Sequence, residues 1–274
     1  AAEVGDVDLS KPLADADFDA IREAFWTYAV LIFPDQRLTQ EQHLAFSAKW
    51  GPVEKERTLD PKATPSRFSG EFADISNLTA EGRIWGETSR QRMYKAGNKL
   101  WHTDSSFKRL PSLCSLLYSR KIAPVGGHTQ FADQRAAYDA LPEATKATLH
   151  GLVVEHWIVH SRRRSGFTEF NEDEMKRLPP VPQVLVRTIP QTGRKSLYLS
   201  PAHSAGMEGM DPAEGAALHN PFHLGWFSLV ERARDTAARG DSQQAFDLLM
   251  EADYDFGSLA EIETDLTESI AIIR

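Results

Sequence analysis

The sequence predicts an α+β protein with a mainly β core, either a β-sandwich or a barrel, that is covered by helices. Two observations favour this fold class. Between residues 110 and 200 the apolar runs indicate short strands, whereas helical periodicity frames both ends of the chain. After about residue 220 the pattern changes again, and helices are expected there with little β-structure between them.

The N-terminal region is expected to form a helix, a strand and a second helix. Residues 15–29 carry apolar side chains at helical spacing, and the β-branched run at 30–33 then predicts a strand. The second helix should begin at Thr39, because Thr39 and Gln42 have the spacing of a capping box. His43 lies on the apolar face of that helix and is expected to be a core residue.

The middle of the chain is expected to be rich in strands. The runs that predict them are residues 73–78, 113–122, 153–159, 184–189 and 196–199. The last two are joined by residues 190–194 (Pro-Gln-Thr-Gly-Arg), which predict a hairpin turn. Residues 133–151 are expected to form two short helices that are broken at Leu141 and Pro142.

The C-terminal part is expected to be helical. The predicted helices cover residues 224–239, 242–252 and 258–272. The last of them has the clearest pattern, because apolar residues recur at intervals of three and four after Ser258, which can cap the helix.

The whole-chain composition is that of an ordinary globular protein, with 41% hydrophobic and 26% charged residues in 274. A net charge of −8 with scattered basic residues argues against nucleic acid as a partner. The longest basic run, Arg162–Arg164, is interpreted as a solvated turn, with a clamp for an anion as the alternative.

We expect neither a membrane span nor a secretory signal, because no apolar run has the required length and the N-terminus lacks the layout. The single cysteine, Cys114, is expected to be a buried, inert thiol. A cytoplasmic location follows as the expectation. The chain starts with Ala instead of Met, which suggests that it begins inside a longer protein.

The strongest candidates for chemistry are His102 and Asp104. Residues two apart in an extended segment project to the same face, so an imidazole and a carboxylate can converge there on one cation. Together with a distant second histidine they would form the facial triad that suits iron(II). The pair alone is weak evidence, since nine histidines and 39 acidic residues in 274 positions give roughly one such pair by chance.

Two segments around this pair carry a resemblance to a known family. Residues 98–107 (Asn-Lys-Leu-Trp-His-Thr-Asp-Ser-Ser-Phe) resemble the metal-binding segment of the taurine dioxygenase and 2,4-dichlorophenoxyacetate dioxygenase family. Residues 124–131 (Pro-Val-Gly-Gly-His-Thr-Gln-Phe) resemble the family's Gly-Gly-Asp-Thr segment. Similarity to the phenoxyacetate branch extends in order over residues 1–215, and it includes residues 46–52, 73–77, 135–142 and 185–188.

This resemblance implies a fold and a division of the chain. Residues 1–215 would form a double-stranded β-helix, or jelly-roll, core with flanking helices. Residues 216–274 would form a helical segment that does not match the family.

The resemblance also implies a cofactor, a cosubstrate and a reaction. Iron(II) would be held by His102 and Asp104, and 2-oxoglutarate would place its far carboxylate at Thr129, with Asn98 as a second cofactor-binding candidate. The enzyme would use dioxygen to hydroxylate a small organic acid, most closely an aryloxyalkanoate such as 2,4-dichlorophenoxyacetate, releasing a phenol and glyoxylate. Lys95 and Lys99 are candidate partners for the acid, or else solvated lysines.

Two departures keep alternatives open. His128 stands where the family has aspartate, and the late histidine ligand and the arginine that would pair with 2-oxoglutarate are missing after residue 215. A separate alternative keeps the same chemistry and changes the substrate to a sulfonate or alkyl sulfate, as in members of the taurine type. The other is a dioxygenase-fold protein with an incomplete site that acts as a binding module. The oligomeric state is open, with a homo-oligomer among the options.

The remaining histidines divide into three groups. His203 follows a strand and is a candidate for a role on the substrate side. His219 and His223 are four residues apart and could form a metal pair, although Pro221 between them breaks the helical geometry. Histidines in the apolar runs are expected to be structural, and these are His150, His156 and His160.

Overall fold

The structure is a computed structural model that describes residues 1–55, 67–121, 129–207 and 270–273. Its helices are α1 (Asp15–Tyr28), α2 (Gln40–Ala48), α3 (Arg90–Lys95), the 3₁₀-helix η1 (Ala96–Lys99), α4 (Gln134–Asp139), α5 (Glu143–Leu149), α6 (Ile158–Arg164) and α7 (Glu172–Arg177). Its strands are β1 (Ala2–Glu3), β2 (Val30–Phe33), β3 (Ser115–Tyr118), β4 (Val153–His156), β5 (Val181–Val184), β6 (Val186–Thr188), β7 (Lys195–Leu197), β8 (Ser204–Met207) and β9 (Ile270–Ile273).

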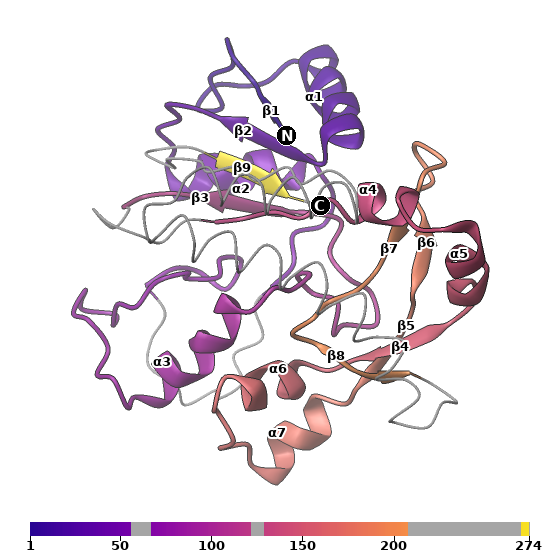
Figure 1. Cartoon of the computed structure of the whole chain (residues 1–274). Coiled ribbons are helices and arrows are strands. Elements are labelled where there is room, and N and C mark those ends of the chain that lie inside the picture. Colours follow the sequence, from indigo (N-terminus) through magenta and orange to yellow (C-terminus); the bar gives the residue numbers. More distant parts are fainter. Residues whose placement is uncertain (56–66, 122–128, 208–269, 274) are drawn as a thin grey trace, which may run out of the picture.

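The described strands form three small sheets. The first has the order β1-β2-β9-β3, in which β1 runs parallel to β2 and the other neighbours are antiparallel. The second has the antiparallel order β5-β4-β8, and the third is the hairpin of β6 and β7. Figure 1 shows α1 and α2 beside the first sheet, and α6 and α7 at the opposite end of the molecule near β4 and β8.

The N-terminal elements confirm the helix, strand and helix that the sequence predicts. Helix α1 ends where Ala29 adopts a left-handed conformation, with φ at 63°. Thr39 and Gln42 form the predicted capping box at the start of α2. His43 is buried in α2, as predicted, and its ring contacts that of Tyr118.

Two separate apolar cores hold these elements. The N-terminal core joins α1, β2 and α2, and its buried residues are Leu9, Phe18, Ile21, Phe25, Leu31, Phe33, Leu38 and Phe46. The second core packs α4 and α5 against β4, β7 and β8, and its buried residues are Tyr138, Leu141, Leu149, Val154, Leu185, Leu197, Leu199 and Met207. The two predicted helices of residues 133–151 and the predicted hairpin turn of 190–194 are confirmed.

Two predicted strands differ from the structure. Residues 73–78 form no strand, and only an isolated bridge joins Leu78 to Ile84. The strand predicted for 153–159 ends at His156, and the chain enters α6 at Ile158. Apolar residues fit either a strand or a short buried helix, so periodicity alone could not locate this boundary.

The prediction of a helix over residues 258–272 is wrong for its last residues. Residues 270–273 form β9, which pairs with β2 on one side and β3 on the other, so that Ala271 lies opposite Ile32 and Leu117. The Ile-Ala-Ile-Ile run is rich in β-branched residues, and pairing on both sides satisfies its backbone groups. The other two predicted helices and the boundary at 215 lie outside the described residues.

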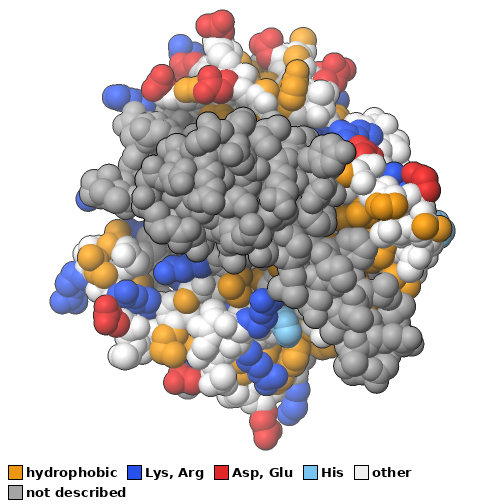
Figure 2. Space-filling view, in the orientation of Figure 1, with side chains coloured by type: hydrophobic (Ala, Val, Ile, Leu, Met, Phe, Trp, Pro, Cys, Tyr) orange, Lys and Arg blue, Asp and Glu red, His pale blue; other side chains and the backbone are white. Residues whose placement is uncertain are grey.

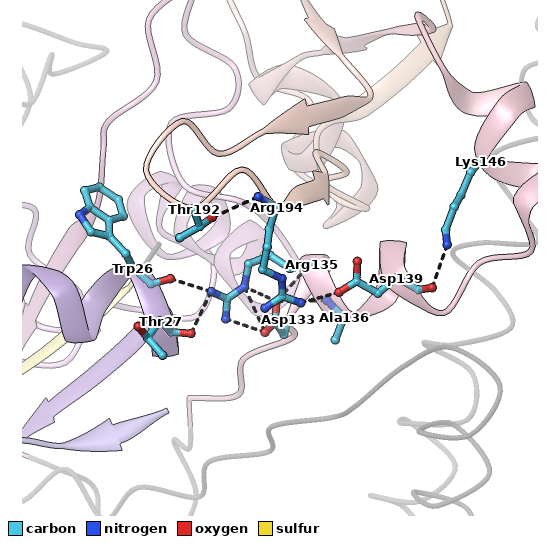
Figure 3. A network of polar contacts seen from close by, with 9 residues as sticks. All are labelled: Trp26, Thr27, Asp133, Arg135, Ala136, Asp139, Lys146, Thr192 and Arg194. Atoms are coloured by element: carbon cyan, nitrogen blue, oxygen red, sulfur yellow. Dashed lines mark hydrogen bonds and ion pairs between the residues drawn. The ribbon is translucent and has the colours of Figure 1, made fainter.

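A network of polar contacts fixes α4 against the end of α1 (Figure 3). The guanidinium of Arg135 donates to the carbonyl oxygens of Trp26 and Thr27 at 3.1 and 3.2 Å, and to both carboxylate oxygens of Asp133. A cation at these carbonyls complements the negative end of the helix. Burial disfavours ionisation of Asp133, but the hydrogen bonds from Arg135 outweigh it and hold the pKa of that carboxyl below its usual range.

Two further expectations concern the single cysteine and membrane-spanning helices. Cys114 is only half-buried, and it packs against the N-terminal core. Within the part of the chain that the structure describes, no helix combines the length and the apolar character needed to cross a membrane.

Candidate metal centre

The segment between η1 and β3 carries the two predicted metal ligands. Thr103, between the two ligands, fixes this segment to residues 199 and 200. Its Oγ1 donates to the carbonyl of Leu199 at 3.0 Å, and its N–H donates to Oγ of Ser200 at 3.1 Å. Because successive residues of an extended segment project to opposite faces, His102 and Asp104 share the other face.

The two side chains converge as the sequence predicts. Nε2 of His102 and Oδ1 of Asp104 lie 3.2 Å apart, and the side chains keep 27% and 56% of their exposure, so both are reachable from solvent. Nδ1 of His102 lies 2.6 Å from the carbonyl of Leu100, which requires a proton on Nδ1 and leaves Nε2 facing Asp104. Oδ2 of Asp104 accepts a hydrogen bond of 2.7 Å from Ser115 on β3.

The two groups stabilise each other's charged forms. Burial works against a charged His102, but the hydrogen bonds to Asp104 and to the Leu100 carbonyl outweigh it and raise the pKa of the imidazole. The hydrogen bond from His102 lowers the pKa of Asp104, with help from Ser115 and against the effect of burial. Without a cation, therefore, the pair is held by a proton on His102, and a bound metal would take that proton's place.

The donor set fits iron(II) in two of its three protein positions. One imidazole nitrogen and one carboxylate oxygen, each oriented by a hydrogen bond on its far side, are what a 2-histidine-1-carboxylate centre requires. In the described residues no three His, Cys, Asp or Glu side chains form a group that could hold a metal. The predicted pair His219 and His223 lies outside them.

His203 lies beside the pair and is buried. Its ring centroid is 5.9 Å from that of His102, and its Nδ1 lies 2.9 Å from Oγ of Ser200 and 3.1 Å from Oγ of Ser106. Ser200 Oγ also accepts from the N–H of Thr103, so Ser200 links His203 to the segment that carries the metal pair. Burial and the nearby positive charges of His102 and Arg162 lower the pKa of His203 to about 3.

The interpretation of Arg162–Arg164 as a solvated turn is wrong for its first residue. Arg162 lies in α6 and is 7% exposed. Its Nη2 donates to Oδ1 of Asn98 at 2.9 Å, and its guanidinium carbon lies 4.5 Å from the centroid of the Tyr94 ring. Sequence reasoning missed this burial, because only the packing of α6 on η1 distinguishes the first arginine from the next two.

The structure also positions the other predicted site residues. Thr129 is half-buried in the segment that leads to α4, directly after residues outside the described part. The ammonium of Lys95 donates to the carbonyls of Asp74 and Ser76, whereas Lys99 is exposed.

The three predicted structural histidines differ in burial. His156 is fully buried and stacks on Tyr198, with ring centroids 5.5 Å apart. His160 is half-buried. His150 is exposed at the end of α5, so the prediction of a structural role inside an apolar run is wrong for that residue.

Comparison with known proteins gives consistent matches. Residues 1–223 match the family described as "Taurine catabolism dioxygenase TauD, TfdA family". The chain is 39% identical over 219 residues to the alpha-ketoglutarate-dependent 2,4-dichlorophenoxyacetate dioxygenase of Cupriavidus pinatubonensis, covering 80% of this chain and 76% of the relative. It is 36% identical over 214 residues to the (S)-phenoxypropionate/alpha-ketoglutarate-dioxygenase of Sphingobium herbicidovorans, covering 75% and 69%.

The fold is similar to that of solved structures. The crystal structure of AAD-2 in complex with Mn(II) and N-oxalylglycine matches with a TM-score of 0.76 and 35% identity, over 99% of this chain and 84% of that one. A putative alpha-ketoglutarate dependent 2,4-D dioxygenase from Burkholderia xenovorans matches with a TM-score of 0.70 and 30% identity, over 99% and 83%.

Proposed function

The chain belongs to the TauD, TfdA family of dioxygenases, and from that premise we propose that it is an iron(II)- and 2-oxoglutarate-dependent enzyme that oxidises an aryloxyalkanoate. One observation supports this above the others: His102 Nε2 and Asp104 Oδ1 converge within 3.2 Å in a chain that is 39% identical to a 2,4-dichlorophenoxyacetate dioxygenase. We also infer a jelly-roll core, of which the described sheets are parts, and the TM-score of 0.76 to AAD-2 supports that inference.

His102 and Asp104 would hold the iron. When bound, iron(II) and 2-oxoglutarate would supply the oxidising chemistry with dioxygen: one oxygen atom enters succinate as the cosubstrate loses carbon dioxide, and the other enters a C–H bond of the substrate. The protein's part is orientation: the Leu100 carbonyl fixes the tautomer of His102, and Ser115 fixes the carboxylate of Asp104. The third protein ligand is to be sought outside the described residues.

The cosubstrate is proposed to extend toward Thr129, with Asn98 as a second contact. A hydroxyl and a carboxamide can each donate a hydrogen bond to a carboxylate oxygen. Thr129 is half-buried and Asn98 is exposed, so neither is closed to a ligand.

The substrate is proposed to be an organic acid that carries an aryl ether. Although the chain has a net charge of −8, Figure 2 shows Lys and Arg side chains gathered over the half of the molecule that holds α3 and α6, whereas Asp and Glu predominate beside α1. His203 lies beside the metal pair, with its ring centroid 5.9 Å from that of His102, and it is proposed as a further contact for the acid. Hydroxylation next to the ether oxygen would give a hemiacetal that breaks down to a phenol and glyoxylate.

Succinate formation from 2-oxoglutarate tests the proposal. With iron(II) and air, 2,4-dichlorophenoxyacetate is expected to stimulate succinate formation and to release 2,4-dichlorophenol in equal amount, whereas taurine is expected to stimulate little. Stimulation by sulfonates or alkyl sulfates without stimulation by phenoxy acids would contradict the proposed substrate class. The absence of succinate with every acid tested would contradict the enzyme assignment itself.

A further inference from the structure

Arg162 is a buried cation without an acidic partner among the described residues. Its side chain is 7% exposed, and no ion pair joins it to an Asp or Glu in that part of the chain. An isolated buried charge is costly, and proteins normally pair it or hydrogen-bond it fully. Comparably buried Arg135, in contrast, has Asp133 beside it.

The hydrogen bonds of Arg162 are also incomplete. Its guanidinium has five N–H donors, of which Nη1 reaches Oγ of Ser161 at 3.3 Å and Nη2 reaches Oδ1 of Asn98 at 2.9 Å. The buried Nε has no hydrogen-bond partner among the residues that the structure describes. Tyr94 also interacts with the guanidinium, through its ring, whose centroid lies 4.5 Å from the guanidinium carbon, and through a side-chain hydrogen bond, but it supplies no negative charge.

The guanidinium lies against the segment that leads to the metal pair. A side chain at Gly97 in η1 would overlap Nη1 of Arg162 and come within 2.9 Å of its Cδ, so the glycine makes room for the arginine. η1 ends three residues before His102.

We propose that Arg162 and Asn98 together form a carboxylate-binding site beside the metal centre. The inference rests on the proposed function for the identity of the acid, which is either the far carboxylate of 2-oxoglutarate or the carboxylate of the substrate. A carboxylate supplies the missing negative charge and accepts from Arg162, while the amide nitrogen of Asn98, whose oxygen is engaged by the arginine, can donate to the same group.

Binding by calorimetry tests the proposal without turnover, on the full chain loaded with Mn²⁺ in the absence of oxygen. Two pairs of ligands differ only in one carboxylate: an aryloxyacetate and its neutral aryloxyacetamide, and 2-oxoglutarate and 2-oxovalerate. Arg162→Gln is expected to weaken one acid by about ten- to hundredfold and to leave unchanged the affinity for its counterpart that lacks this carboxylate. The pair that loses its discrimination identifies which carboxylate the site takes.

Two further variants separate binding from folding. Arg163→Gln, in the same helix and exposed, is the matched control and is expected to change neither affinity. Asn98→Asp would place a carboxylate on Arg162 from within the chain. It is expected to raise the melting temperature, because the buried charge becomes paired, and to weaken binding of the same acid at least tenfold, because the site is filled.

The results that overturn the proposal are distinct. They are unchanged affinity for both acids in Arg162→Gln, equal weakening of an acid and of its counterpart that lacks the carboxylate, and unchanged acid binding in Asn98→Asp. Failure of the wild-type protein to bind either acid would overturn it as well. If only the aryloxyacetate fails to bind, the proposed substrate is wrong, and the 2-oxoglutarate pair still decides the role of Arg162.

Discussion

At the residue scale, hydrogen bonds on the far side of each candidate ligand do more to aim it than packing does. His102 and Asp104 keep 27% and 56% of their side-chain exposure, so neighbouring atoms do not confine them tightly. The Leu100 carbonyl fixes the orientation of the His102 ring, and the Ser115 hydroxyl fixes that of the Asp104 carboxylate. The remaining pair of atoms, Nε2 and Oδ1, is left facing the same point.

Removing the hydroxyl of Ser115 should loosen the carboxylate of Asp104. Ser115→Ala is expected to weaken iron(II) binding by about tenfold, because outer-sphere partners of metal ligands typically contribute that much or more. A competition titration with a chelating indicator measures the affinity. Ser196→Ala, which removes a hydroxyl that donates to the neighbouring Leu197 carbonyl, is the control. Equal affinities of Ser115→Ala and the wild type would contradict this role for Ser115.

His43 should make folding sensitive to acid. Burial, with a smaller effect of Arg120, lowers the pKa of His43 to about 4 from an ordinary value of 6.5. Between those values the unfolded state binds more protons than the folded state, so the free energy of unfolding falls as the pH drops from 6.5 to 4 and this contribution levels off below. The loss from this residue should approach about 3 kcal/mol.

The comparison of wild type with His43→Asn isolates that contribution, because both share every other titrating group. Urea unfolding at intervals from pH 7 to pH 4 should show a steeper loss of stability in the wild type. Parallel curves for the two proteins would mean that His43 does not stay neutral in the folded state.

At the element scale, short helices depend on a few charged anchors. α4 has only six residues, and Arg135 links it both to Asp133 at its own start and to the last carbonyls of α1 (Figure 3). Arg194 in turn joins Asp139 at the end of α4 to the hairpin of β6 and β7. The first arginine is 7% exposed in its side chain and the second 42%, so their contributions should differ.

Arg135→Met is expected to destabilise the protein by about 3 kcal/mol, because it leaves a partly buried carboxylate and two helix carbonyls without their donor. Arg194→Met removes an exposed ion pair and is expected to cost less than about 1 kcal/mol. Chemical denaturation of the two variants measures the difference. A loss for Arg194→Met as large as that for Arg135→Met would contradict the assignment of the buried network as the anchor.

Local signals in the sequence predict local structure, and contacts between distant segments explain most of the differences. The capping box of Thr39 and the turn at residues 190–194 need only neighbouring residues, and both are confirmed. The strand at 270–273 depends on partners more than 150 residues away, and its apolar spacing also fits a helix. The burial of Arg162 likewise depends on η1, which ends 63 positions before Arg162 in the chain.

The candidate site divides in the same way. The His102 and Asp104 pair could be predicted, because residues two apart need only an extended backbone to converge. Ser115 and His203 come from other segments, and no spacing in the sequence places their side chains beside the pair.

At the scale of the whole molecule, β9 joins the first and last parts of the described chain in one sheet. It lies between β2 and β3, so its loss would leave two strands without a common neighbour. Ala271→Pro is expected to cost about 3 kcal/mol or more, because proline removes a ladder hydrogen bond in a central strand. Ala271→Gly keeps the N–H and should cost about 1 kcal/mol. Similar unfolding midpoints for both variants would contradict the placement of β9 between two partners.

The central claim is that His102 and Asp104 bind iron together with 2-oxoglutarate, and one measurement tests it most directly. Anaerobic addition of iron(II) and 2-oxoglutarate should produce the weak visible charge-transfer band of a chelated 2-oxo acid. The band is expected in the wild type and in His150→Ala, whose exposed imidazole is remote in sequence from the pair, and it should be lost in His102→Ala and Asp104→Ala. An undiminished band in Asp104→Ala would contradict the assignment of that carboxylate as a ligand.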